Sequence, residues 1–330
     1  MCGIAGILSN KRDLGTSLNQ MIESMHHRGP DYGAYKIFNN LGLAHTRLSI
    51  IDLSASGNQP MEDDEGSMAI IFNGEIYNYQ ELKIDLEKKG IKFKNTSDTE
   101  VLLNGYKSEG LRFFKKIRGF YAVAIFDSKN NNLLLTRDAH GKKPLYYAQI
   151  NGEFIFASEL KTIIRQLGSI PDPNYDALSH YLWKGYFANG DTAFDGIHSL
   201  MPGSGIILNT DTFEKKSIKV LERIKLEVSS SFQNREIDLI ENELREAVDY
   251  RMIADVPLGT FLSGGVDSSI ISLVASRISK DINTFSIGFP DEPLFDESKY
   301  ANLVAKHICS NHHTFEVTNN DLFNNLEEIL

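Results

Sequence analysis

The chain has 330 residues, with 34 Lys and Arg against 44 Asp and Glu, for a formal net charge of −10. That length predicts about two domains, each large enough to bury its own core. A hydrophobic share of 42% and a charged share of 24% are ordinary for globular proteins and exclude collagen-like, disordered and disulfide-framework chains. The acidic balance and scattered basic residues argue against a nucleic-acid or anionic-membrane surface.

Targeting and redox signals are equally plain. No apolar run approaches the roughly 18 residues that span a bilayer, and the first ten residues lack a basic region followed by a long apolar one. The two cysteines, Cys2 and Cys309, exclude a disulfide scaffold and fit a reducing compartment. We therefore expect a cytoplasmic protein with no membrane partner.

The position of Cys2 directly behind Met1 suggests a chemical role. A small second residue lets the initiator methionine be removed, so the mature chain would begin with a cysteine. Its α-amine then has an unperturbed pKa of about 7.7 to 8.0 and can act as the base for its own thiol. The alternative is a buried cysteine that happens to lie near the start of a strand.

The first half of the chain shows mainly strand patterns. Apolar residues recur at helical spacing over 14–25, and the break at 27–31 ends that helix. Strand-like runs follow at 42–53 and 68–77. The second run contains Asn73-Gly74, a strong tight-turn pair, which predicts a hairpin at that point.

Two helices and four short strands follow in this half. Helices are expected at 79–89, ended by Gly90, and from Asp98 onward. The strands are separated by Asn, Gly and Pro turns and are expected at 120–126, 133–137, 145–149 and 154–157. These elements predict sheets with two or three helices packed on them.

The composition changes near Asn209, and a linker is expected over 210–234. Beyond it, strands and helices alternate. The expected helices are 237–248, 268–278 and 297–308, and the expected strands are 256–262, 284–289 and 314–317. This alternation predicts a parallel α/β layout.

The segment LSGGVDSS, from Leu262 to Ser269, lies between a predicted strand and a predicted helix. Two glycines let backbone N–H groups turn toward an anion, the serine hydroxyls add donors, and the helix N-terminus adds its dipole. The Walker lysine spacing and the G-x-G-x-x-G pattern are both missing. The segment therefore predicts a pyrophosphate site, with simple helix capping by Asp267 as the alternative.

Seven ordered motifs resemble those of the glutamine-hydrolysing asparagine synthetase family. They are MCGIAGI at the start, HRGPD at 27–31, AHTRLSIID at 44–52, FNGEIYN at 72–78, SDTE at 97–100, R-D-x-x-G-x-K-P-L-Y-Y at 137–147 and SGGVDSS at 263–269. The resemblance runs from residue 2 to the end of the chain. Family members are nearly twice as long, so the chain looks truncated at its C-terminus, without the family's later S-G-E-G-x-D-E motif.

The resemblance implies an α+β domain followed by an α/β domain. Residues 2–209 would form a type-2 glutamine amidotransferase domain of the N-terminal-nucleophile hydrolase fold, with two antiparallel sheets between helical layers. Residues 210–234 would be a linker. Residues 235–330 would be the incomplete start of a parallel-sheet ATP domain of the PP-loop pyrophosphatase type.

The resemblance also implies a catalytic set in the first domain. Cys2 would attack the glutamine carboxamide, and the Asn73 side chain with the Gly74 N–H would stabilise the oxyanion, since a turn leaves a backbone donor free. If the residues have no such role, Asn73-Gly74 is merely a hairpin turn.

Glutamine binding would use charged groups of the same domain. Arg47 would hold the α-carboxylate, and Asp98, with Glu75 and the Gly74 carbonyl, the α-ammonium. The implied binding set is completed by Leu48, Ser49, Ile50, Ile51 and Asn73. The alternatives are a surface charge on a strand for Arg47 and a helix cap for Asp98.

In the second domain the resemblance implies an ATP site and a magnesium ligand. The implied ATP-binding residues are Leu262, Ser263, Gly264, Gly265, Asp267, Ser268 and Ile287. Asp267 would also bind Mg²⁺, which prefers oxygen ligands. ATP would activate the side chain of aspartate as an acyl-adenylate, and ammonia would arrive from the first site through an apolar channel.

We therefore expect an asparagine synthase that uses glutamine, aspartate and ATP, with a homodimer as its expected assembly. A second hypothesis keeps the same glutaminase but delivers ammonia to another acceptor, such as a surface-polysaccharide sugar. A third is a non-catalytic fragment whose N-terminus stays blocked by Met1.

Overall fold

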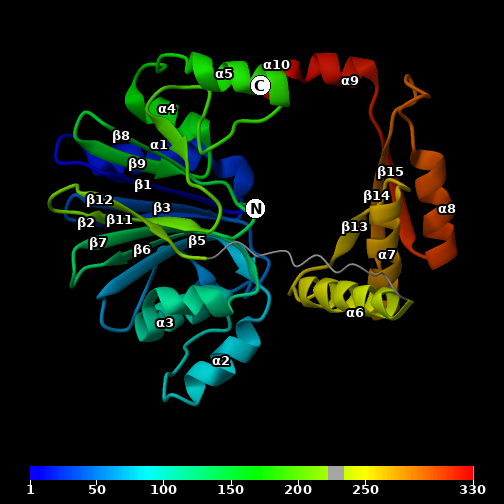
Figure 1. Ribbon diagram of the computed structural model, residues 1–330, viewed down its shortest axis with the longest axis horizontal. Helices are drawn as coiled ribbons and strands as arrows, with labels where there is room; N and C mark the ends of the chain where they lie inside the picture. Colours follow the sequence, from blue (N-terminus) through cyan, green and yellow to red (C-terminus); the bar gives the residue numbers. More distant parts are fainter. Residues whose placement is uncertain (222–233, 330) are drawn as a thin grey trace. The chain divides into compact units, whose positions relative to one another are not determined.

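The computed structural model describes residues 1–221 and 234–329. The chain forms two compact units, Met1–Leu226 and Glu227–Leu330, and each is described here by itself (Figure 1). Most of the segment that we expected to be a linker, residues 222–233, lies outside the described residues.

The first unit contains a six-stranded antiparallel sheet with strand order β10-β8-β9-β1-β3-β2. Its strands are β1 (Gly3–Leu8), β2 (Tyr32–Phe38), β3 (Leu41–Arg47), β8 (Tyr146–Ile150), β9 (Glu153–Ala157) and β10 (Ile197–Ser199). All six residues of β1 are buried. Gly6 allows this close packing, because a Cβ there would lie 2.4 Å from the Phe156 ring. The strand that follows Cys2 is thus central in its sheet and closely packed.

The second sheet of this unit is also antiparallel, with strand order β12-β11-β7-β6-β5-β4. Its strands are β4 (Met61–Glu62), β5 (Met68–Ile76), β6 (Gly119–Asp127), β7 (Asn132–Arg137), β11 (Ser204–Asn209) and β12 (Lys215–Lys219). The strands expected at 120–126, 133–137, 145–149 and 154–157 are confirmed as β6, β7, β8 and β9.

The hairpin predicted at Asn73-Gly74 is wrong. Strand β5 runs straight through the pair, and Asn73 and Gly74 lie opposite Ala122 and Tyr121 of β6. A nine-residue register with β6, in a run of apolar and β-branched residues, outweighs the local turn preference of the dipeptide. Glycine is needed here for a different reason, since a Cβ at Gly74 would lie 2.1 Å from the Phe120 carbonyl oxygen.

The two sheets pack face to face with helices outside them (Figure 1). Ile4 and Leu8 of β1 enter the core between the sheets, whereas Ala5 and Ile7 pack on the outer side. Helices α1 (Leu14–Ser24) and α4 (Leu160–Leu167) cover the first sheet, and α2 (Tyr79–Glu87) and α3 (Asp98–Glu109) lie beside the second. The unit also contains α5 (Tyr175–Lys184), η1 (His26–Arg28), η2 (Ala55–Gly57) and η3 (Gly110–Lys116). The expected four-layer arrangement is confirmed.

The first unit continues beyond residue 209, where we expected the linker to begin. Strand β12 pairs antiparallel with β11 and forms the edge of the second sheet. The intervening turn is closed by the Asn209 N–H, which donates to the Glu214 carbonyl oxygen at 3.0 Å. Because β12 is a lysine-rich, largely exposed edge strand, its composition resembles that of a linker.

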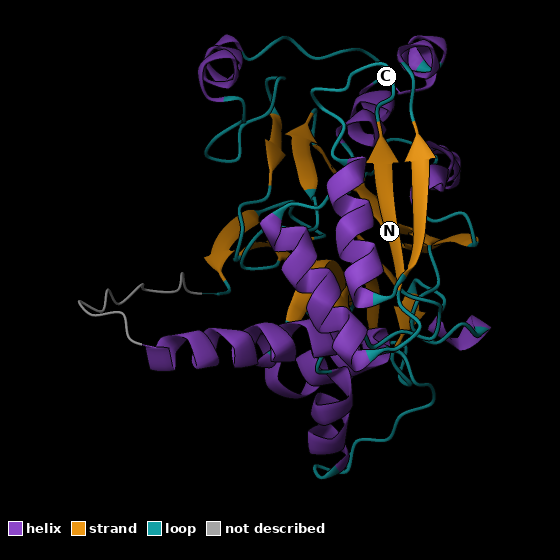
Figure 2. Ribbon diagram, turned by 90° about the vertical axis from the view of Figure 1, so that its right-hand side faces the viewer, coloured by secondary structure: helices purple, strands orange, loops and turns teal. Residues whose placement is uncertain are grey.

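The second unit contains the predicted parallel sheet, with strand order β13-β14-β15. Figure 2 shows two long strands of this sheet side by side with the same direction. The elements of this unit are α6 (Asn234–Arg251), β13 (Gly259–Phe261), α7 (Val266–Ile278), β14 (Asn283–Gly288), α8 (Ser298–Ile308), β15 (Asn311–Glu316), α9 (Asn319–Asn324) and α10 (Leu326–Ile329). Within the described parts of both units, no helix has the length and apolarity needed to cross a bilayer.

Candidate active site

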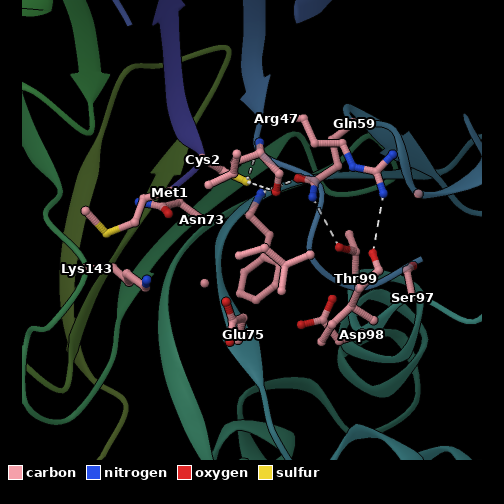
Figure 3. A pocket seen from close by; sticks show the side chains of 16 residues that line it. Met1, Cys2, Arg47, Gln59, Asn73, Glu75, Ser97, Asp98, Thr99 and Lys143 are labelled. Atoms are coloured by element: carbon pink, nitrogen blue, oxygen red, sulfur yellow. Dashed lines mark hydrogen bonds between the residues drawn. The ribbon is translucent and has the colours of Figure 1, made fainter. Parts of the chain in front are cut away.

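One pocket of the first unit gathers the side chains that the sequence placed in a glutaminase site (Figure 3). The predicted residues that line it are Cys2, Arg47, Leu48, Ile50, Ile51, Asn73, Gly74, Glu75 and Asp98. Ser49 does not line it; its N–H instead donates to the Asp31 carboxylate at 2.8 Å. Segments separated by up to about a hundred residues in sequence thus meet around the Cys2 thiol.

Cys2 enters the pocket just before β1 and is held by backbone and guanidinium contacts. Its Sγ lies 3.5 Å from the Leu48 nitrogen and 3.6 Å from the Leu48 oxygen. The Arg28 Nε donates to the Cys2 carbonyl at 3.0 Å, and Arg28 also pairs with Glu159 at 3.1 Å. Burial raises the pKa of the Cys2 thiol, so the free thiol needs a base to attack an amide.

The Asn73 side chain is an unsatisfied amide inside this pocket. The residue is 1% exposed, and neither Oδ1 nor Nδ2 has a hydrogen-bond partner among the described residues. Leaving a buried polar group unpaired costs about 1 to 3 kcal/mol. A polar group kept in this state beside a thiol is ready to bind a polar atom of a ligand.

The Gly74 N–H lies on the free edge of β5 and faces the same space. On that edge the Phe72 N–H donates to Gln59 Oε1 at 2.6 Å, and the Ile76 N–H donates to Asp98 Oδ2 at 3.0 Å. Because strand residues alternate in direction, the Gly74 N–H points the same way, between these two. The Gly74 amide and the Asn73 side chain are therefore two donors beside the thiol, although no turn is present.

Arg47 is buried rather than a surface charge, so that alternative is wrong. Only 5% of it is exposed, and the guanidinium donates to the Ser54 carbonyl at 2.8 Å, to Asn58 Oδ1 at 2.7 Å and to the Asp52 carbonyl. The strand expected over 42–53 ends at Arg47 because the following loop turns back around this guanidinium. A Cβ on Gly57 would lie 2.3 Å from Nη2, so the loop needs glycine there.

Asp98 is not the N-cap of α3, so the alternative role of a helix cap is wrong for this residue as well. Ser97 is the N-cap and accepts the Glu100 N–H at 3.2 Å, whereas the Asp98 carboxylate turns toward β5. Burial raises the pKa of Asp98 to about 7; the Ile76 N–H opposes this and the nearby Glu75 charge adds to it. Burial also raises the pKa of Glu75. Two carboxyl groups that need a cation thus lie in one pocket.

The Asp98 titration predicts opposite effects of Asp98→Asn on glutamine use and on stability. The raised carboxyl pKa means that the folded state keeps a proton that the unfolded chain releases between about pH 4 and 7. Stability therefore falls as pH rises through that range, and the neutral amide should raise the free energy of unfolding at pH 8 by on the order of 3 kcal/mol.

The same variant should weaken glutamine use, because an amide does not pair with an ammonium as a carboxylate does. We expect the KM for glutamine to rise about 10- to 100-fold at pH 8. In the wild type, KM should fall as pH rises toward 7. Urea unfolding and glutaminase assays at pH 5.5 and 8 check both effects; equal stability of the two proteins at pH 8 would contradict the first.

Several lining residues were not foreseen: Met1, Gly57, Gln59, Phe72, Ser97, Thr99 and Lys143. Met1, Phe72, Ser97, Thr99 and Lys143 lie inside the motifs described above, so the sequence did contain a signal for them. Gln59 had none; it is 6% exposed and bridges the Phe72 N–H to Thr99 Oγ1, to which its Nε2 donates at 3.1 Å.

In the second unit, the SGG segment lies between β13 and α7, as predicted. Gly264 has a φ of +85°, and a Cβ there would lie 2.5 Å from the Tyr300 Cβ. The hydroxyls of Ser263 and Ser268 lie 3.0 Å apart, and the Gly265 N–H donates to Ser263 Oγ at 3.3 Å. Backbone amides and hydroxyls at a helix N-terminus are the donors that a phosphate group needs.

The other predicted ATP-site residues have different environments. Leu262 is buried and its N–H donates to the Phe285 carbonyl at 2.8 Å, whereas Ile287 on β14 is half exposed. Asp267 lies exposed in the first turn of α7. Across the described residues, no group of three or more His, Cys, Asp or Glu side chains is placed to hold a metal. The magnesium role of Asp267 stays a prediction.

Stacked antiparallel sheets with a cysteine at the start of a central strand define the N-terminal-nucleophile hydrolase fold class. A solved chain of glutamine phosphoribosylpyrophosphate amidotransferase from Bacillus subtilis shares this fold, with a TM-score of 0.52 and 15% identity over 96% of this chain and 81% of its own. The glutamine amidotransferase domain family model matches residues 1–218, so the chain belongs to that family. Residues 239–330 match the asparagine synthase model.

Curated relatives carry both segments. Asparagine synthetase [glutamine-hydrolyzing] 1 of Bacillus subtilis is 34% identical over 88% of this chain and 46% of its own length. Asparagine synthetase B of Escherichia coli is 31% identical over 96% and 54%, and Amidase chyE of Penicillium rubens is 30% identical over 99% and 52%. The chain spans about half the length of these relatives.

Proposed function

We propose that the first unit hydrolyses glutamine to glutamate and ammonia, and that the whole protein uses the ammonia to form asparagine. The observation that carries the first part is the buried Asn73 amide, which has no hydrogen-bond partner among the described residues and lies in the same pocket as the Cys2 thiol. An amide so placed matches the donor needed for the oxyanion of an acyl-transfer intermediate.

The reaction begins after removal of Met1 frees the Cys2 α-amine. The amine takes the thiol proton, the sulfur attacks the carboxamide carbon, and the oxygen that becomes negative is held by Asn73 Nδ2 and the Gly74 N–H. The amine then returns its proton to the leaving nitrogen, which departs as ammonia. Water hydrolyses the resulting thioester to release glutamate, and the thiol regains its proton.

Substrate orientation follows from the charges of the pocket. Arg47, fixed by its loop, would hold the α-carboxylate, and Asp98 with Glu75 would hold the α-ammonium. Leu48, Ile50 and Ile51 would pack against the aliphatic part of glutamine. The carboxamide is then left facing Cys2.

For the second step we propose that the loop from Ser263 to Ser268 holds the pyrophosphate part of ATP, with Mg²⁺ at Asp267, and that aspartate is activated as an acyl-adenylate. Matches of residues 239–330 to the asparagine synthase family support this. Cytoplasmic location and a homodimer belong to the same proposal. A second candidate is another acceptor, because relatives of similar identity include one named an amidase.

The decisive experiment measures glutamate release from glutamine by protein whose N-terminus has been shown by mass spectrometry to be Cys2. Release that depends on Cys2 supports the glutaminase. Absence of release from correctly trimmed, folded protein overturns it. Formation of asparagine from aspartate, ATP and glutamine by the complete reading frame tests the acceptor, since an enzyme for a different acceptor makes none.

A further inference from the structure

The R-D-x-x-G-x-K-P motif has no part in the glutamine site proposed so far, yet it forms a turn built around one buried carboxylate. Asp138 is 1% exposed and follows β7. Its Oδ1 accepts the N–H groups of His140 at 3.0 Å and Lys142 at 3.1 Å. Its Oδ2 accepts the N–H groups of Lys143 at 3.2 Å and Tyr121 at 3.3 Å. The carboxylate therefore fixes the end of the turn against β6.

The guanidinium of Arg137 closes the same turn from its other side. Its Nε donates to the Lys143 carbonyl at 2.6 Å, Nη2 to the Gly141 carbonyl at 2.5 Å and Nη1 to the Leu200 carbonyl at 2.7 Å. Both backbone polar groups of Lys143 are thus held by charged side chains. Such a rigid turn presents the Lys143 side chain at a defined place.

That place is the glutaminase pocket. Lys143 lines it together with Met1, Cys2 and Glu75, and Figure 3 shows its ammonium directed into the pocket from the side of Met1. Other elements also bring charged groups to this region: Arg28 of η1 donates to the Cys2 carbonyl, and Arg47 of β3, Glu75 of β5 and Asp98 of α3 line the pocket. Arg47 and Lys143 are the two cationic side chains among the described residues that line the pocket, and the Arg47 guanidinium already donates to its own loop.

A cation at this position acts on both members of the catalytic pair. It opposes protonation of a nearby amine and favours loss of the proton of a nearby thiol. In the untrimmed chain, burial is the main cause that lowers the pKa of the Met1 α-amine next to Cys2, and the charges of Arg28 and Lys143 act in the same direction. Lys143 likewise opposes the increase that burial causes in the pKa of Cys2. The carboxylates of Glu75 and Asp98 have the opposite influence.

We propose that Lys143 is a positioning residue of the glutaminase site, whose ammonium keeps the Cys2 α-amine in its unprotonated form, able to take the thiol proton, near neutral pH. This inference rests on the proposed function of Cys2. Without the Lys143 ammonium, the carboxyl groups of Glu75 and Asp98 would favour the protonated form of the Cys2 α-amine, which cannot act as a base. The motif from Arg137 to Lys143 then serves catalysis without touching glutamine.

The test compares Lys143→Met with Lys143→Arg and with Lys142→Met. Lys142 is exposed on the same turn, with its Nζ 5.1 Å from the Phe120 ring centroid, so its loss removes the same charge outside the pocket. All variants carry Cys309→Ser, so that Cys2 is the sole thiol. The pH dependence of kcat/KM for glutamine hydrolysis and of Cys2 alkylation by iodoacetamide is measured from pH 5 to 9.

In Lys143→Met we expect the acidic limb of both profiles to move up by about 0.5 to 1 pH unit, and activity at pH 6.5 to fall about 3- to 10-fold. Lys143→Arg should keep the wild-type limb, and Lys142→Met should not move it. Lys143→Gln provides a second neutral variant, and each Tm is recorded to identify any variant that fails to fold.

Three results overturn the inference: unmoved limbs in folded Lys143→Met and Lys143→Gln, an equal shift in Lys142→Met, or a loss of activity that is the same at every pH. Failure of the proposed function appears differently, as wild-type protein that releases no glutamate at any pH. Alkylation does not need glutamine, so it reports on Lys143 in either case.

Discussion

Cys2→Ala is expected to lower glutamate release from glutamine by at least about 10⁴-fold, because Cys2 is the only cysteine among the described residues that line the pocket. The fold should survive, since the buried packing of this segment begins at Gly3 and the whole of β1 remains. Alanine is also small enough for Met1 to be removed, so the variant keeps a free N-terminal amine. Glutamate release, measured with mass spectrometry of the N-terminus, checks this result.

Cys309→Ser is the matched control for this variant. Cys309 is the other free cysteine, is exposed at the end of α8 and belongs to the second unit. Its replacement should leave glutaminase activity within about twofold of wild type, as expected for surface substitutions. If Cys2→Ala keeps more than a tenth of the activity, the thiol is not the nucleophile and the mechanism above is wrong.

The layered fold was readable from local patterns because several of its strands are buried on both faces and therefore appear in the sequence as short continuous apolar runs. Asn73-Gly74 shows where local reading fails. The dipeptide favours a tight turn, but nine cross-strand pairs with β6 hold it in an extended strand. These partners lie about 50 residues away in sequence, so neighbouring residues alone do not reveal them. The edge strand β12 was missed for the opposite reason, since an exposed, lysine-rich strand has no apolar alternation to detect.

The motifs identified most of the site residues, but they did not predict how buried those residues are or which groups they contact. The sequence leaves Arg47 and Asp98 open to ordinary surface and capping roles, and only tertiary structure decides between these and a buried pocket. Both are almost fully buried. Nothing in the sequence pointed to Gln59. Its role in linking β5 to α3 through hydrogen bonds to Phe72 and Thr99 is visible only in the tertiary structure.

These environments also explain how a stable scaffold keeps a reactive site. The pocket contains the Asn73 amide, which no described residue pairs with, and the Asp98 carboxyl, whose pKa is raised. Each is unfavourable in the empty protein and becomes favourable when a ligand supplies the missing partner. The close packing of the largely buried strands β1 and β5 supplies the compensating stability.

Asn73→Ala is the direct test of that argument. Loss of one oxyanion donor should lower kcat for glutamine hydrolysis about 10²- to 10³-fold, with KM changed only a few-fold, because the donor acts mainly in the transition state. The same variant removes an unpaired buried amide, so the free energy of unfolding should rise by about 1 kcal/mol or more. Steady-state kinetics and urea unfolding measure the two effects.

Asn58→Ala is the informative comparison, since Asn58 also has a side-chain amide near the pocket but is bonded to Arg47 at 2.7 Å. Its loss should loosen the guanidinium, raise KM about tenfold and lower stability, with kcat nearly unchanged. The two asparagines therefore predict opposite patterns in both measurements. An Asn73→Ala protein that is less stable and shows only a higher KM would mean that this amide binds ground-state glutamine, and the oxyanion would then depend on the Gly74 N–H alone.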